Sequence, residues 1–201
     1  MGLWLAAAPL VLASSSAVRR QLLEAAGIPV EVRPARLDER AVETSAPRDN
    51  PSAVAALLAR AKALRVAAEI PGRLVVGADQ TLALGSRRFD KPAACAAARA
   101  QLQALAGRAH ELHAAVAVAR DEAVMFEHVA VARLTMRPLS DAFLDRYLAA
   151  AGRAVTASVG AYQLEALGVH LFERLEGDHF TILGLPLLPL LAYLRAEGSL
   201  A

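Results

Sequence analysis

Cysteine and aromatic residues are scarce in this chain of 201 residues. Phe, Trp and Tyr together make up 4% of the sequence, so the broad base-stacking surface of a single-strand nucleic-acid binder is not expected. The single cysteine, Cys95, has no partner for an internal disulfide, and we expect it to pack within an alanine-rich helix. Low cysteine content fits a reducing compartment, so we expect a cytoplasmic protein.

An excess of one charge is also missing. The formal net charge is +2, and the basic residues are scattered rather than arranged in a stripe, so we expect no nucleic-acid partner. No apolar run is long enough to span a bilayer. The apolar residues 2–13 lack a basic start and are interrupted by Pro9, so we expect neither a signal peptide nor a membrane partner.

Hydrophobic residues are plentiful, at 56% of the chain, and residues 1–201 suit a single domain with a sizeable core. Segments with strand periodicity alternate with helical ones, and at least two neighbouring strand pairs are joined as hairpins. We therefore predict an α/β fold with a mixed, twisted sheet rather than a purely parallel one.

Capping residues and turn signals give the expected element bounds. Strands are predicted at residues 9–13, 30–33, 74–79, 82–84, 87–89, 109–119 and 123–137, with a last hairpin joining 171–175 to 180–183. Helices are predicted at residues 17–26, 52–69, 93–106 and 140–150, and from 187 to about 197. The polar residues 36–48 are expected to form a loop.

The stretch from Leu10 to Arg20 joins a buried strand, three serines and two arginines. Ser16 is a good N-cap for the helix that follows, and free N–H groups at a helix N-terminus favour an anion. Arg19 and Arg20 oppose the helix dipole there. A bound phosphate would account for two arginines at this unfavourable position. Alternatively, both side chains are solvated at the surface.

Other charged residues lie near expected element ends. An acid at a strand end, as expected for Asp79, can hold a divalent cation or orient water, and Glu39 with Asp79 would suit Mg²⁺. Arg19, Lys62 and Lys91 could neutralise a polyphosphate. Taken singly, each residue also has an ordinary structural explanation, such as a turn cap or a solvated helix position.

The five histidines show no zinc-site spacing with cysteine. His110 and His113 are three residues apart in an expected strand, so their side chains would lie on opposite faces. We interpret the histidines as structural or surface residues.

Eight segments, in this order and spacing, resemble the Maf family of nucleoside triphosphate pyrophosphatases. They are Leu12 to Arg19, Asp38-Glu39, Lys62-Ala63, Gly77 to Gln80, Asp90-Lys91-Pro92, Ala106 to His110, Gly160-Ala161-Tyr162 and Gly184-Leu185-Pro186. The resemblance extends from about Leu10 to Arg195. It implies a two-lobed fold of the Maf or ITPase type around a cleft, often as a homodimer.

The resemblance further implies hydrolysis of a nucleoside triphosphate to the monophosphate and pyrophosphate with a divalent cation, Mg²⁺ or Mn²⁺. Carried over by motif, the catalytic positions are Asp79 and Lys91, the substrate-binding ones Ser14, Arg19, Lys62, Gln80 and Glu165, and the metal-binding ones Glu39 and Asp79. A nucleotide-binding regulator of septum formation, with weak or no hydrolysis, is the alternative.

The subtype that the resemblance favours acts on 7-methyl-GTP. Members that act on dTTP and UTP carry Thr after the aspartate, whereas this chain has Gln80, and Glu165 also matches the 7-methyl-GTP type. Two positions depart from the family pattern. Val18 stands where Arg or Trp is expected, and Ala166 stands where Gly is usual.

Overall fold

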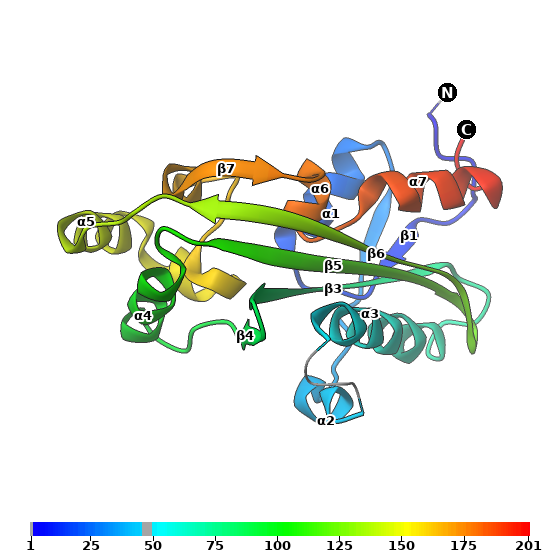
Figure 1. The fold of residues 1–201 in the computed structure, drawn as a ribbon. Helices are drawn as coiled ribbons and strands as arrows, with labels where there is room; N and C mark the ends of the chain where they lie inside the picture. The colour runs from blue at the N-terminus through cyan, green and yellow to red at the C-terminus, as the bar shows by residue number, and fades with distance from the viewer. Residues whose placement is uncertain (1, 46–49) are drawn as a thin grey trace.

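A seven-stranded mixed sheet runs through the computed structural model, which describes residues 2–45 and 50–201 (Figure 1). The strand order is β2-β1-β3-β5-β6-β7, and β4 pairs with β3. Strand β1 is parallel to β2 and β3, and the other pairs are antiparallel, which confirms the predicted mixed sheet. The strands are β1 (Leu10–Leu12), β2 (Val30–Val32), β3 (Val75–Leu84), β4 (Arg87–Phe89), β5 (Ala109–Arg120), β6 (Ala123–Met136) and β7 (Phe172–Glu176).

Most helices begin where their capping residues predict. Ser16, Asn50 and Ser140 each accept a hydrogen bond from the backbone N–H three residues on, which satisfies one of the free donors of the first turn. The helices are α1 (Ala17–Ala25), α2 (Glu39–Glu43), α3 (Pro51–Ala67), α4 (Cys95–Leu105), α5 (Asp141–Ala151), α6 (His179–Ile182) and α7 (Leu187–Ala196). Within the described ranges, none is long and apolar enough to cross a membrane.

The core is divided between two lobes. In one lobe, α3 covers one face of the sheet while α1 and α7 cover the other (Figure 1). In the second lobe, α4 and α5 pack around the far ends of β3, β5 and β6, with Leu82, Leu102 and Leu144 at the centre. The two-lobed α/β architecture is therefore confirmed.

Helix α3 lies unusually close to β3. A Cβ atom added at Gly77 would lie 2.1 Å from the carbonyl oxygen of Ala59 and 2.6 Å from the backbone nitrogen of Ala63. Only glycine on the strand and alanine on the helix allow such an approach. The close contact brings Lys62 of α3 within reach of Asp79 on β3.

The prediction that a strand ends at Asp79 is wrong. Strand β3 continues to Leu84, because β5 pairs with it along nearly its whole length. Strand β1 stops beside Val76, and β4 pairs only with Leu82 to Leu84, its last residue, Phe89, lying opposite Leu82. In the part of the chain that the structure describes, no strand pairs with residues 77–81 on that side. Asp79 therefore lies in the middle of a strand but beside an open edge.

Two other expected elements differ. The segment 36–48 contains helix α2, which begins because Asp38 caps the backbone N–H of Ala41 at 3.1 Å; residues 46–48 lie outside the described residues. Residues 180–183, expected as a hairpin arm, fall largely in helix α6, which is capped by Asp178. Strand β7 pairs with β6 instead.

The expectation for Cys95 is also wrong. The residue begins helix α4 and is exposed rather than packed in the core. Alanine-rich sequence alone does not say which face of a helix is buried, because alanine is common on both.

Candidate active site

A cavity of about 820 Å³ opens beside the unpaired edge of β3. All eight residues predicted for the site line it: Ser14, Arg19, Glu39, Lys62, Asp79, Gln80, Lys91 and Glu165. They come from the loop after β1 and helices α1, α2 and α3, from strand β3, and from two later loops. Its volume is within the usual range for small-molecule and cofactor sites.

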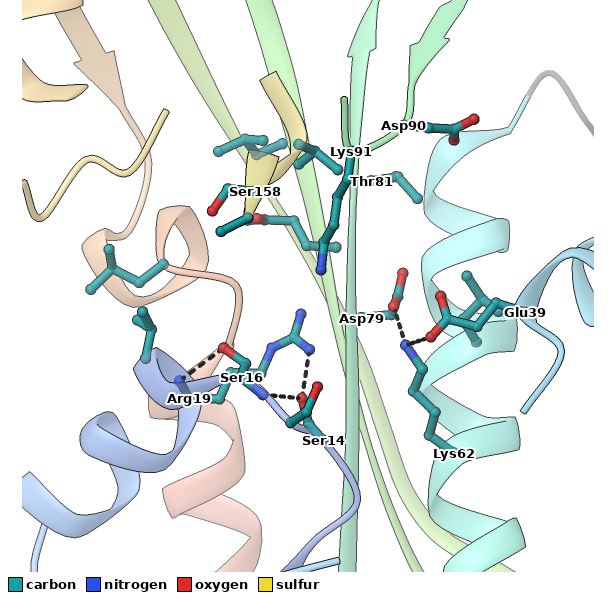
Figure 2. A pocket seen from close by; sticks show the side chains of 18 of the residues that line it. Ser14, Ser16, Arg19, Glu39, Lys62, Asp79, Thr81, Asp90, Lys91 and Ser158 are labelled. Atoms are coloured by element: carbon teal, nitrogen blue, oxygen red, sulfur yellow. Dashed lines mark hydrogen bonds and ion pairs between the residues drawn. The ribbon is translucent and has the colours of Figure 1, made fainter. Parts of the chain in front are cut away.

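Lys62 lies between two carboxylates (Figure 2). Its Nζ atom is 2.6 Å from Oδ1 of Asp79 and 2.8 Å from Oε1 of Glu39. The side chains of Lys62 and Asp79 are 10% and 12% exposed, whereas that of Glu39 is 50% exposed. The cluster thus has a buried end on the sheet and an open end on α2.

Burial raises the pKa of Asp79 above that of an ordinary aspartate. The positive charges of Lys62 and Arg19 and the hydrogen bond from Lys62 oppose this shift, while Glu39 adds to it. A raised pKa makes the carboxylate a better proton acceptor than an exposed one.

Arg19 occupies the open edge of β3. Its Nε atom donates to the carbonyl oxygen of Gly184 at 2.8 Å, and its Nη1 atom donates to the carbonyl of Ala78 at 2.8 Å and to Oγ of Ser14 at 3.1 Å. Burial lowers the pKa of Arg19, but a guanidinium stays charged in proteins. Of the two arginines, only Arg20 is exposed on the surface.

Gln80 faces the side of the sheet opposite to Asp79, as neighbours in a strand must. Its amide nitrogen donates to the carbonyl oxygens of Thr181 and Ile182, both at 3.0 Å. Both N–H groups of the amide are therefore used to hold the end of α6. The carbonyl oxygen Oε1 is the polar atom that remains for a ligand.

Lys91 and Glu165 are exposed and line the same cavity. The Lys91 side chain points toward the space between Arg19 and Asp79 (Figure 2). Beside Glu165, Ala166 has a negative φ of −132°. The replacement of the usual glycine at this position therefore does not require the left-handed backbone that favours glycine.

A divalent cation fits this site as one shared with substrate. Among residues 2–45 and 50–201, no three His, Cys, Asp or Glu side chains form a metal cluster, but Glu39 and Asp79 already converge on one cation, Lys62. Mg²⁺ is commonly held by one or two carboxylates together with substrate phosphates. Six carboxylates and five cationic side chains line the cavity, so its side chains alone do not neutralise a triphosphate.

Two features of the site escaped prediction. Glu43 and Arg88 form an ion pair at 2.5 Å on the cavity wall, and Oγ1 of Thr81 donates to the carbonyl of Pro51 at the start of α3. The first feature joins residues 45 positions apart, so no local spacing could have indicated it.

The histidines in the core are structural. His110 is 1% exposed, and its Nε2 atom lies 2.8 Å from the hydroxyl of Tyr162. Burial lowers the pKa of His110 to about 4. His113, also buried, is 2.8 Å from Oγ of Ser52 through its Nδ1 atom, so it ties β5 to the first turn of α3.

Comparison with known proteins identifies full-length relatives. A family model described as Maf-like protein matches residues 9–197. A nucleoside triphosphate pyrophosphatase of Bradyrhizobium diazoefficiens is 59% identical over 201 residues and 100% of both chains. A 7-methyl-GTP pyrophosphatase of Rhizobium johnstonii is 54% identical over 195 residues, covering 95% of this chain and 97% of the relative. Among solved structures, a HAM1 protein from Coxiella burnetii is 17% identical, with a TM-score of 0.37 over 64% of this chain and 72% of that one.

Proposed function

The chain belongs to the Maf-like protein family, and we propose that it is a nucleoside triphosphate pyrophosphatase, which releases a nucleoside monophosphate and pyrophosphate. The observation that carries this proposal is the convergence of Arg19, Lys62, Asp79 and Lys91 on one cavity beside the open edge of β3. Its full-length relatives carry the names of enzymes. No observation favours the alternative of a regulator without hydrolysis.

In this proposal, Asp79 is the proton acceptor for the attacking water. Its carboxylate is buried beside Lys62, and burial raises its pKa, so it can take the proton as the oxygen–phosphorus bond forms. Arg19 and Lys91 hold the phosphate oxygens and the negative charge that develops during the displacement. Ser14 orients the guanidinium of Arg19 through their 3.1 Å hydrogen bond.

Glu39 and Asp79 would hold the divalent cation, Mg²⁺ or Mn²⁺, which supplies charge neutralisation of the phosphates when bound. Lys62 now compensates both carboxylates. A divalent cation at those carboxylates would release the ammonium of Lys62 to pair with a phosphate oxygen. The lysine thus has a partner both with and without substrate.

The substrate we favour is a guanine nucleotide of the 7-methyl-GTP type. Oε1 of Gln80 and the carboxylate of Glu165 are acceptors on the cavity wall, and acceptors suit the N–H groups of a guanine edge. One relative of similar length carries the name 7-methyl-GTP pyrophosphatase. Val18 also lines the cavity and leaves room that an Arg or Trp side chain would fill.

A substrate panel tests this proposal. Pyrophosphate release from 7-methyl-GTP, GTP, dTTP, UTP and ATP is measured with Mg²⁺ and, separately, Mn²⁺. We expect turnover with 7-methyl-GTP preferred. A preference for dTTP or UTP would overturn the role given to Gln80 and Glu165, and an absence of turnover with every nucleotide would overturn the function itself.

We also propose that residues 1–201 act as one domain, in the cytoplasm. The cavity lining runs from Ala13 to Leu183, so most of the chain is needed to build the site. A homodimer stays a prediction from the family resemblance, to be measured by light scattering coupled to gel filtration.

A further inference from the structure

Helix α2 is held to the rest of the protein by charge rather than by apolar packing. None of its residues is buried. Ion pairs attach it at both ends: Glu39 lies 2.8 Å from Lys62 of α3, and Glu43 lies 2.5 Å from Arg88 of β4. Both pairs are on the wall of the cavity.

The two acids of α2 share one face. Glu39 and Glu43 are four residues apart, and side chains at this spacing are neighbours on a helix surface, where like charges repel. Each acid is compensated by a cation from a different element. The positions of Lys62 and Arg88 therefore determine the orientation of this face of α2.

Arg88 is a well-anchored point. Strand β4 pairs with β3 so that Arg88 lies opposite Ala83, and the next residue, Phe89, is buried at 5% exposure. The side chains of Arg88 and Glu43 are only 24% and 27% exposed, so solvent screens this pair less than a surface pair. Glu43 is thus fixed relative to β3, the strand that carries Asp79.

We propose that the Glu43–Arg88 ion pair is a positioning device that holds Glu39 beside Asp79 as a metal ligand. This inference rests on the proposed function, in which both carboxylates hold the divalent cation. When a cation and phosphates compete for Glu39 and Lys62, the contact between those two residues is lost. The Glu43–Arg88 pair then keeps α2, and with it Glu39, at the cavity.

The direct alternative is that Arg88 itself binds a phosphate of the substrate. The two possibilities make opposite predictions for Glu43→Gln. If Arg88 binds phosphate, removal of Glu43 frees the guanidinium and maintains or improves substrate binding. If the pair positions Glu39, removal of Glu43 weakens metal binding as much as removal of Arg88 does.

The experiment measures Mn²⁺ binding to the full chain, from the electron paramagnetic resonance signal of free Mn²⁺, together with pyrophosphate release as a function of Mg²⁺ concentration. For Glu43→Gln and Arg88→Gln we expect dissociation constants for Mn²⁺ raised about three- to fivefold, the factor for an ion pair worth up to about 1 kcal/mol. The Mg²⁺ concentration for half-maximal rate should rise by a similar factor, with the loss recovered at high Mg²⁺.

Two controls accompany these variants: an exchange of the charges of Glu43 and Arg88, and removal of a comparable ion pair elsewhere. The double variant Glu43→Arg, Arg88→Glu should recover most of the Mn²⁺ affinity, because the attachment is rebuilt with reversed polarity. Arg60→Gln removes an ion pair of similar type, between Arg60 and Glu127 at 2.9 Å outside the cavity, and should leave both measurements unchanged.

Unchanged Mn²⁺ binding in both single variants would overturn the positioning role, while wild-type turnover would leave the proposed function standing. Weakened substrate binding in Arg88→Gln, with unaffected substrate binding in Glu43→Gln, would assign Arg88 to the substrate. This result would also overturn the positioning role. If Glu39→Gln binds Mn²⁺ as wild type does, Glu39 is no ligand and the inference fails at its premise. Lack of nucleotide turnover in wild type is a separate result, which concerns the function alone.

Discussion

Burial raises the pKa of Asp79, the residue on which the proposed chemistry depends, and Lys62 opposes this shift. An ionised Asp79 is required to accept a proton, so activity should fall as the pH falls through its pKa, which burial has raised above 3.8. Lys62→Met removes the 2.6 Å ion pair with Asp79 and with it the charge that lowers the pKa of Asp79. We expect the acid limb of the kcat/KM profile to move to higher pH in this variant. A limb that stays in place, measured on the residual activity, would contradict the assignment of Asp79 as the base.

We expect His110 to make the stability of the fold sensitive to acid. Burial lowers its pKa to about 4, below the value of 6.5 expected for an unfolded chain. The unfolded state therefore binds more protons between these values, so this contribution is fully present above pH 6.5 and is lost as the pH falls toward 4. The loss should reach about 3 kcal/mol.

Urea unfolding of wild type and His110→Gln between pH 4 and pH 8 measures this effect. The variant should be less stable at neutral pH, because the contact with Tyr162 changes, and its stability should vary less with pH. Parallel curves for the two proteins would show that His110 does not cause the acid sensitivity.

At the level of single residues, the family motifs singled out eight positions that all line one cavity, and their roles stay a prediction. Asp79 lies at this cavity although the strand predicted to carry it was too short. The dual use of the Gln80 amide by Thr181 and Ile182 was not predictable, because backbone carbonyls about 100 residues away leave no pattern in local sequence.

Among the elements, the contact of α3 with β3 positions Lys62 beside Asp79. Gly77→Ala would press a Cβ atom against Ala59 and Ala63, and overpacking of this kind costs about 1–3 kcal/mol. We expect the free energy of unfolding to fall by about that amount and kcat to fall with it, since α3 carries Lys62. Gly2→Ala, where a Cβ atom meets nothing within 4 Å, should change neither. A Gly77→Ala protein as stable as wild type would show that the contact is readily relaxed.

Element ends were predictable where one residue determines them. Ser16, Asn50 and Ser140 cap their helices as the sequence indicates. The errors occurred where a distant partner decides: β5 extends β3 past Asp79, and β6 rather than residues 180–183 pairs with β7. Helix α2 has five residues, which is too short for its sequence to show a helical hydrophobic period.

On the scale of the whole molecule, the cavity exists because β1 and β4 each cover only part of one edge of β3. The mixed sheet was predictable from its hairpins, but the gap between the two partial partners depends on the register of three strands. The cleft was predicted from the family resemblance and not from the hydrophobic pattern of the sequence.

Metal removal should affect activity without unfolding the protein. Lys62 already compensates Glu39 and Asp79, so the cluster has no unbalanced carboxylates when the cation is removed. We expect EDTA to abolish nucleotide hydrolysis while the melting temperature changes by less than about 2 °C, equivalent to at most about 1 kcal/mol. A large fall in melting temperature on chelation would indicate a structural metal instead.

The most direct test follows the products of wild type and Asp79→Asn by phosphorus NMR, with a nucleoside triphosphate and Mg²⁺. Wild type should yield monophosphate and pyrophosphate in equal amounts. Asp79→Asn, with its fold verified by circular dichroism, should be slower by about 10²–10⁴-fold, the usual contribution of a general base. Nucleoside diphosphate and orthophosphate as products would contradict the proposed pyrophosphatase function. Full activity in Asp79→Asn would contradict the assignment of Asp79 as the base.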